Sequence, residues 1–259
     1  MKVIAVMSPK GGIGKTTTAD SIAYILGEEY EKRVLIIDGD PQGDTSKTFG
    51  CYETEETGMS RLLEYHVCTG GEWHTPELIW PTKYPHIDML PANGYLVRTD
   101  LNLMISQDEN QITRLREALA EVSEEYDYCI CDCGRLFDMV VVNILIASEL
   151  IIAPVKVGGY ENEAINSLCE QVTDLQEMNP ELKIKGILTM RQKNKTSLEF
   201  EEYLKKVSEL DMFETPVRRS IMAEKATIAM TALPAFSKRG IVTQDYRSVV
   251  RELLEEMEV

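Results

Sequence analysis

The feature that most constrains the fold is a glycine-rich loop near the amino terminus, between an apolar run and a helix-forming segment. The run is Val3–Met7, and the segment Thr16–Glu29 carries apolar residues at helical spacing. Glycines let the backbone turn tightly and aim successive N–H groups at one point, and the helix that follows adds its positive end. The loop therefore predicts a phosphate-binding site, and its residues are Lys10, Gly11, Gly12, Ile13, Gly14, Lys15, Thr16 and Thr17.

Two side chains of the loop add the chemistry that a nucleotide requires. Lys15 stands where a lysine can reach the β- and γ-phosphates, and Thr16 follows it with a hydroxyl that can ligate Mg²⁺. A glycine-rich turn with incidental lysines would not need a strand before it and a helix after it. The loop thus predicts a nucleotide bound together with a magnesium ion.

The rest of the chain alternates short apolar runs with helical segments, which is typical of βαβ units and a parallel sheet. The sequence predicts one α/β domain over residues 1–259, with a mainly parallel twisted sheet of about seven or eight strands and helices on both faces. The least regular stretch, about 66–86, is expected to be an ordered insertion. Further strands are expected at Val34–Ile37, Ile87–Leu90, Tyr128–Cys131, Leu150–Ala153 and Ile184–Thr189, and further helices at Gln107–Glu125, Glu161–Met178, Leu198–Leu210 and Val242–Met257.

The loop departs from the common P-loop pattern, because position 9 is Pro and position 10 is a second lysine. With this lysine the sequence resembles the deviant Walker A ATPases, a P-loop NTPase family that includes the ParA (Soj-like) partitioning proteins and the Min-type division-site proteins. The resemblance implies ATP and Mg²⁺ as cofactors and a homodimer that closes over two nucleotides. It also implies that Lys10 reaches across the dimer to the nucleotide of the other subunit.

Two downstream motifs extend the resemblance over most of the chain. The segment Asp38-Gly-Asp40-Pro-Gln-Gly is similar to the family's second motif and fits its ParA branch better than its Min-type branch. By resemblance, Asp38 lies near Mg²⁺ and Asp40 positions the attacking water. The strand that ends at Asp132 resembles the Walker B strand, so this carboxylate would hold Mg²⁺ through water. Lys10, Lys15 and Asp40 are the implied catalytic residues.

Two segments after Walker B bear on how the nucleotide is sensed. Thr189 and Met190 stand where family members border the adenine, so the resemblance implies that they contact it. After Asp132 the family usually continues C-P-P-S, whereas this chain reads Cys133-Gly134-Arg135-Leu136. This loop is the family's second switch, and the coupling of ATP to partners therefore stays open.

The charge of the chain is distributed unevenly. The net charge is −16, which argues against nucleic-acid binding by the chain as a whole. Residues 1–182 carry a net −18, residues 183–251 a net +6, and residues 252–259 a net −4. A basic segment inside an acidic protein suggests a face with a separate electrostatic task. The candidate DNA contacts in it are Arg191, Lys193, Arg218, Arg219 and Arg247.

The resemblance implies a slow, partner-stimulated ATPase that binds DNA nonspecifically and drives chromosome or plasmid partitioning. A small DNA-binding activator of the ParB type would be its partner, and the protein would associate with the nucleoid. A membrane is not expected as a partner, because four of the last eight residues are acidic and anionic lipid would repel them. Two other classes stay open: a positioning ATPase that acts through pilus, secretion or chemosensory proteins without DNA, and a metabolic ligase that uses the same loop.

Composition adds two limits. No apolar run approaches the roughly 18 residues that would suggest a membrane span. None of the six cysteines forms a C-x-x-C pair, which argues against a zinc site and a thioredoxin-like motif, and reduced thiols in a cytoplasm are expected. Cys129, Cys131 and Cys133 alternate along one apolar run, so they are expected to pack rather than to ligate a metal.

Overall fold

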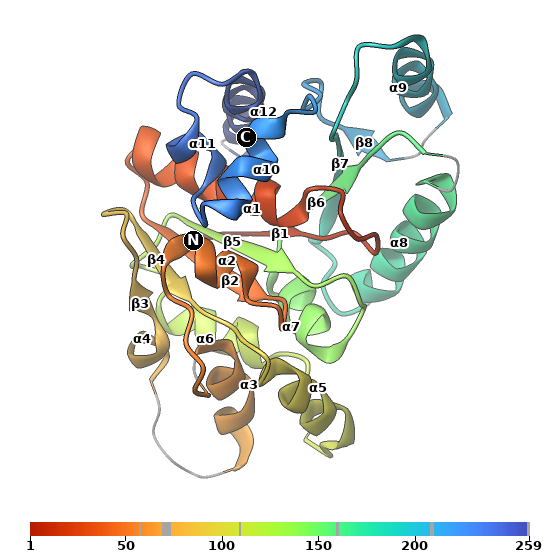
Figure 1. The fold of residues 1–259 in the computed structure, drawn as a ribbon. Coiled ribbons are helices and arrows are strands. Elements are labelled where there is room, and N and C mark those ends of the chain that lie inside the picture. Colours follow the sequence, from red (N-terminus) through yellow and green to blue (C-terminus); the bar gives the residue numbers. More distant parts are fainter. Residues whose placement is uncertain (57, 69–73, 109, 159–160, 208–209, 258–259) are drawn as a thin grey trace.

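A central sheet of eight strands runs through the molecule in the computed structural model, and helices cover both of its faces (Figure 1). The structure describes all of 1–259 except 57, 69–73, 109, 159–160, 208–209 and 258–259. The strand order is β3-β4-β2-β5-β1-β6-β7-β8, and β3 alone pairs in the antiparallel sense within the described part of the chain. The predicted α/β fold with a mainly parallel sheet is confirmed. The strands are β1 (Lys2–Val6), β2 (Val34–Gly39), β3 (Trp80–Pro81), β4 (Ile87–Leu90), β5 (Tyr128–Cys133), β6 (Leu150–Val155), β7 (Lys183–Leu188) and β8 (Asp211–Met212).

The helices divide between the two faces of the sheet. α1 packs with α11 and α12 on one face, while α3, α5, α6 and α7 pack on the other (Figure 1). The bounds are α1 (Lys15–Tyr24) with the π-helical segment η1 (Ile25–Glu29), α2 (Asp44–Phe49), α3 (Gly58–Cys68), α4 (Thr75–Leu78), α5 (Leu96–Ile105), α6 (Arg114–Glu121), α7 (Met139–Ala147), α8 (Glu161–Gln176), α9 (Lys195–Val207), α10 (Ile221–Ile228), α11 (Leu233–Phe236) and α12 (Ile241–Met257).

Alternate residues of each central strand enter two separate cores. In β1, Val3 and Ala5 pack on the α3–α7 side, whereas Ile4 and Val6 pack on the α1–α12 side. Side chains point to opposite faces at every second residue of a strand, so a strand covered on both faces reads as a continuous apolar run. The three alternating cysteines of β5 are buried on the α7 side, as their spacing predicts.

Several helices differ from the expectation. The helix predicted over 107–125 begins only at Arg114, because Asp108 accepts a hydrogen bond from the backbone N of Asn110 (3.2 Å) and holds the chain in a turn. The helices α2, α3, α4, α5, α7, α10 and α11 were not predicted. α7 is apolar on nearly all sides, and α10 buries only Ala226, so neither shows a one-sided apolar stripe.

The irregular stretch around 66–86 contains recognisable elements. It includes the end of α3, the short helix α4 and the edge strand β3, which pairs with β4. Residues 69–73 of this stretch lie outside the described part of the chain. That it is an insertion stays a prediction.

Candidate functional site

A cavity of about 940 Å³ opens at the carboxyl edge of the sheet, beyond the ends of β1, β2 and β5. Ligands of open α/β sheets bind at this edge, because the loops that follow the strands meet there. Of the eight predicted loop residues, Gly11, Gly12, Gly14, Lys15, Thr16 and Thr17 line the cavity. The rest of its wall consists of Asp20 on α1, residues 40–42, Asp44, Lys47, Thr48, residues 134–136, Asp138, Met190, and parts of 223–233.

The loop between β1 and α1 has the backbone that its glycines permit. Gly12 has φ +66° and Gly14 has φ +93°, a left-handed region that favours glycine, and a Cβ at either position would meet no atom within 4 Å. The demand for glycine there comes from the backbone conformation and not from crowding. The side of the loop that faces the cavity is therefore open to an anion.

Lys15 is folded back onto its own loop. Its Nζ donates to the carbonyl of Lys10 at 2.9 Å. Burial lowers the pKa of Lys15 from its ordinary value, while the nearby carboxylates of Asp132 and Asp40 act in the opposite direction. A half-buried ammonium group beside an open anion nest is placed to neutralise phosphate.

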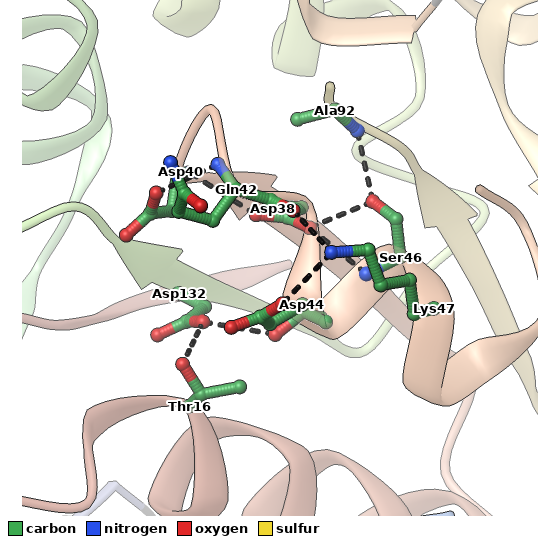
Figure 2. Close-up of polar contacts among 10 residues, drawn as sticks. Thr16, Asp38, Asp40, Gln42, Asp44, Ser46, Lys47, Ala92 and Asp132 are labelled. Atoms are coloured by element: carbon green, nitrogen blue, oxygen red, sulfur yellow. Dashed lines mark hydrogen bonds and ion pairs between the residues drawn. The ribbon is translucent and has the colours of Figure 1, made fainter. Parts of the chain in front are cut away.

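Asp132, at the end of β5, lies beside the start of α1. Its Oδ2 accepts from the hydroxyl of Thr16 at 2.7 Å (Figure 2). The same oxygen accepts from the hydroxyl of Thr45 at 2.9 Å. Its Oδ1 is buried and has no hydrogen-bond partner among the described residues. Burial raises the pKa of Asp132 to about 6, although the two hydroxyls and Lys15 favour its ionised form. An unpartnered buried carboxylate oxygen is costly unless a ligand completes it.

These residues fit a magnesium ion. Mg²⁺ prefers oxygen ligands and usually binds through one or two carboxylates, waters and the phosphates of a substrate. Thr16 and Asp132 supply a hydroxyl and an orphaned carboxylate oxygen next to the phosphate loop. Within the described residues no group of three His, Cys, Asp or Glu side chains could hold a metal ion. The remaining ligands of such an ion would thus be water and phosphate.

Asp38, which pairs with Asp132 across β2 and β5, is held by hydrogen bonds within the protein in this structure, and its role near Mg²⁺ stays a prediction. Its Oδ2 accepts from the backbone N (2.8 Å) and the hydroxyl (2.7 Å) of Ser46, and its Oδ1 accepts from the backbone N of Asp40 (3.1 Å) (Figure 2). Burial, with Asp132 as the next cause, raises the pKa of Asp38 to about 8. In this structure the side chain therefore holds α2 against the end of β2, and neither Asp38 nor Asp132 is among the residues that line the cavity.

Asp40 points into a more open environment. It lines the cavity, and its Oδ1 accepts from the backbone N of Gln42 (2.9 Å). The adjacent loop 134–138 approaches it closely, since a Cβ added to Gly134 would lie 4.0 Å from Asp40 Oδ2. Gly134 and Arg135 thus line the cavity next to Asp40.

The two predicted adenine residues have different positions. Thr189 is buried, and its hydroxyl donates to the carbonyl of Ile13 (2.8 Å), which ties the end of β7 to the glycine loop. Met190 lines the cavity and has φ +53°, which is unusual for a residue other than glycine. Of this pair only Met190 lines the cavity, and the contact of both residues with adenine stays a prediction.

Four of the five arginine and lysine residues predicted to contact DNA lie in ion pairs within the chain, three of them in close pairs. Arg191 Nε lies 3.1 Å from Glu201, Arg218 Nε lies 2.9 Å from Asp245, and Arg247 Nε lies 2.6 Å from Glu29. The other two are exposed: Lys193, and Arg219, whose guanidinium is 3.9 Å from Glu224. Much of the positive charge that the sequence concentrates in residues 183–251 is thus balanced by carboxylates of the same molecule.

Sequence reasoning missed two polar residues beside Asp132. Asp20 lines the cavity from α1, and Thr45 links it to Asp132 through hydrogen bonds of 3.0 and 2.9 Å. It also missed the part of the wall from residues 223–233. Asp20 lies five residues after Lys15 on the buried side of α1. The sequence signal that could have identified it is a charged residue at a position of the helix that faces the core.

The chain is similar to proteins of one family. A family model described as "AAA domain" matches residues 1–184. The chromosome partitioning protein ParA of Myxococcus xanthus is 29% identical over 263 residues, which cover 98% of this chain and 88% of that protein. The sporulation initiation inhibitor protein Soj of Bacillus subtilis is 28% identical over 257 residues, which cover 97% and 98%.

A solved structure extends the likeness of the fold. Cobyrinic acid a,c-diamide synthase from Mycobacterium smegmatis, with bound ATP analog and magnesium, has a TM-score of 0.84 and 24% identity, with 99% of this chain and 95% of that chain covered. At this identity the likeness concerns the fold alone, and it shows that a synthase shares it. No helix in the described part of the chain is long and apolar enough to cross a membrane. From the family model and the full-length relatives together, the chain belongs to the ParA/MinD-like family of P-loop ATPases.

Proposed function

We propose that this chain binds ATP with Mg²⁺ in the cavity and hydrolyses it slowly, as the timing step of a partitioning or positioning system. The observation that carries the proposal is the orphaned Oδ1 of Asp132 beside Thr16, at the foot of an open glycine nest. A neighbour of the same fold is known with an ATP analog and magnesium, which supports the same ligands here.

The chemistry follows from the placement of these groups. Backbone N–H groups of the loop and the ammonium group of Lys15 would hold the phosphates, and Thr16 and Asp132 would hold Mg²⁺, which supplies charge neutralisation when bound. Asp40 faces the cavity and would orient the attacking water. Phosphoryl transfer depends mainly on positioning and on neutralisation of charge, so few side chains are needed.

The rim of the cavity supports a dimer that closes over two nucleotides. Large apolar side chains are exposed around it: Leu136 (64%), Met190 (38%) and Met230 (55%) line the cavity, and α10 carries Ile221 and Ile228 beside it. Exposed apolar patches of this kind mark interaction sites. Lys10, at the start of the loop, would then contribute to the site of the second copy.

The most direct test measures ATP binding and the oligomeric state together. We expect ATP to bind one molecule per subunit in a Mg²⁺-dependent way, and the chain to sediment as a dimer with ATP and as a monomer with ADP. Asp132→Asn is expected to abolish the Mg²⁺ dependence while the fold is kept. A chain that fails to bind ATP with Mg²⁺ would refute the proposal.

A second candidate concerns the target of the ATP-bound dimer. The family resemblance favours nonspecific DNA and a ParB-like activator, in keeping with the partitioning relatives. The ion pairs of Arg191, Arg218 and Arg247 favour the alternative, a positioning ATPase that acts through protein partners without DNA. DNA binding assayed with ATP, ADP and no nucleotide separates the two.

A further inference from the structure

Asp20 is a buried carboxyl group beside the nucleotide cavity for which the chemistry above has no use. It projects from α1, one turn after the phosphate loop, and its side chain is 5% exposed. Its Oδ1 lies 3.0 Å from the hydroxyl of Thr45, and the same hydroxyl lies 2.9 Å from Asp132 Oδ2. Asp20, Thr45 and Asp132 thus form a linear chain of hydrogen-bonding groups that ends on the predicted magnesium site.

If Asp20 and Asp132 are both ionised, these three side chains have one hydrogen too few to form both hydrogen bonds. A threonine hydroxyl has a single hydrogen to donate, while an ionised carboxylate only accepts. Thr45 can therefore donate to Asp20 or to Asp132, but not to both. Since both distances are hydrogen-bond distances and the groups are buried, one of the two acids must supply the second hydrogen by being a neutral carboxylic acid.

The surroundings decide which acid is neutral. Asp132 Oδ2 lies within hydrogen-bond distance of two hydroxyls, those of Thr16 and Thr45, so it acts as an acceptor twice over, as an oxygen of an ionised carboxylate does. Burial raises the pKa of Asp20 well above its ordinary range, and Asp132 is the next cause. Hydrogen bonds from Thr45 and Thr48 lower the pKa of Asp20, but their effect is smaller than that of burial and of the charge of Asp132.

We propose that Asp20 is a positioning residue that, as a neutral acid, donates to Thr45 and so makes Thr45 donate to Asp132. The carboxylate of Asp132 is then held by two hydroxyl donors on Oδ2, which leaves its unpartnered Oδ1 for a ligand. Asp20 acts through Thr45 and does not itself hold the metal. The consequence for Mg²⁺ rests on the proposed function, whereas the hydrogen-bond order does not.

Infrared spectroscopy of the metal-free protein at neutral pH tests the hydrogen-bond order directly. The difference spectrum between wild type and Asp20→Asn is expected to contain the C=O stretch of a neutral carboxylic acid. The difference spectrum between wild type and Asp132→Asn is expected to contain carboxylate bands instead. A carboxylate signal from Asp20 would overturn the proposal, and this measurement does not depend on whether the protein binds ATP.

Titration of Mg²⁺ into protein that is saturated with a non-hydrolysable ATP analogue tests the consequence. Asp20→Asn, with an amide that can still donate and has no charge, is expected to keep the Mg²⁺ affinity within about twofold. Asp20→Ala and Thr45→Val each remove one hydrogen bond of the chain, so the affinity is expected to fall by about tenfold. Thr45→Ser keeps the hydroxyl and is expected to rescue it.

Ser60→Ala is the matched control, because Ser60 is a buried hydroxyl on α3 without a hydrogen-bond partner among the described residues. It should leave the affinity unchanged. If Asp20→Asn loses as much affinity as Asp20→Ala, the negative charge of Asp20 is what matters and the proposal is wrong. If Asp20→Ala retains wild-type affinity while it is folded by circular dichroism, Asp20 has no positioning role.

Discussion

The carboxyl edge of the sheet was predicted from sequence motifs, whereas the basic segment 183–251 was predicted from its net charge, and the structure agrees with the first kind of prediction better than with the second. At the carboxyl edge, short motifs from distant parts of the chain meet in one cavity, where Thr16 donates to Asp132 across 116 positions of sequence. In the basic segment the signal was a sum of charges, and the structure pairs Arg247 with Glu29, which lies 218 positions away. A motif specifies its own local geometry, whereas a net charge does not specify its partners.

The largest expected effect tests the motif side of this comparison. We expect Lys15→Ala to abolish ATP binding, because it removes the ammonium group inside the anion nest. Lys10→Ala should bind ATP normally but fail to dimerise, since by resemblance Lys10 acts on the second copy's nucleotide. Equilibrium nucleotide binding and sedimentation measure both properties. Normal ATP-dependent dimerisation of the Lys10 variant would show that the role implied by the family does not apply here.

Asp40→Ala should leave ATP binding and dimerisation intact but slow ATP hydrolysis at least about tenfold. Groups that orient or deprotonate the attacking water typically increase the rate 10²–10⁴-fold. Single-turnover hydrolysis, followed in parallel with dimer formation, measures this. Asp44→Ala is a suitable control, since Asp44 also lines the cavity but pairs with Lys47. Equal rates for wild type and Asp40→Ala would remove Asp40 from the mechanism.

Sequence alone predicted most of the fold and the phosphate loop, for physical reasons that particular residues show. Gly12 and Gly14 need a left-handed backbone, and strands such as Val34–Ile37 are apolar because both faces of the sheet are covered. It could not predict that Asp38 is enclosed by Ser46, or that Thr45 joins Asp20 to Asp132. Those contacts depend on how α2 docks on the sheet, which no local pattern encodes.

The third effect tests the basic segment as a structural element. Arg218→Ala is expected to lower the free energy of unfolding by about 2–3 kcal/mol, because it leaves the carboxylate of Asp245 buried and unpaired. The expected loss of stability is smaller than the loss for a wholly buried ion pair, because the Arg218 side chain is 30% exposed. Arg219→Ala, with its side chain 61% exposed, should change stability by less than about 0.5 kcal/mol. Urea unfolding of both variants measures these changes in stability. Equal stabilities of the two variants would mean that the ion pair of Arg218 with Asp245 does not stabilise the fold.

The buried carboxyl groups at the carboxyl edge predict an unusual pH dependence of stability. Asp38, with a pKa of about 8, and Asp132, with a pKa of about 6, bind protons in the folded state at a pH where the unfolded chain has lost them. Stability of the metal-free protein should therefore rise by roughly 4 kcal/mol from these two groups as the pH falls from about 8 to about 5.5, with about 3 kcal/mol of it from Asp38. Thermal unfolding across this window measures it. Asp38→Asn should remove the part of the rise that Asp38 contributes, while Asp20, a buried acid whose pKa is also raised, keeps another part. A wild type that loses stability over the same window would contradict the prediction.

The smallest effect decides whether the basic segment contacts DNA at all. If it does, the contacts come from exposed residues such as Lys193 and Arg219 and not from the paired arginines. Binding to arbitrary duplex DNA should then require ATP, because a dimer doubles the number of contacts, and it should weaken as salt rises. Lys193→Glu and Arg219→Glu should each weaken binding several-fold and reduce the slope against log salt by about 0.9. Mobility-shift assays with ATP, ADP and no nucleotide, at several salt concentrations, measure this. An ATP dimer that binds no DNA at about 50 mM salt, where phosphate contacts are strong, would favour a protein partner.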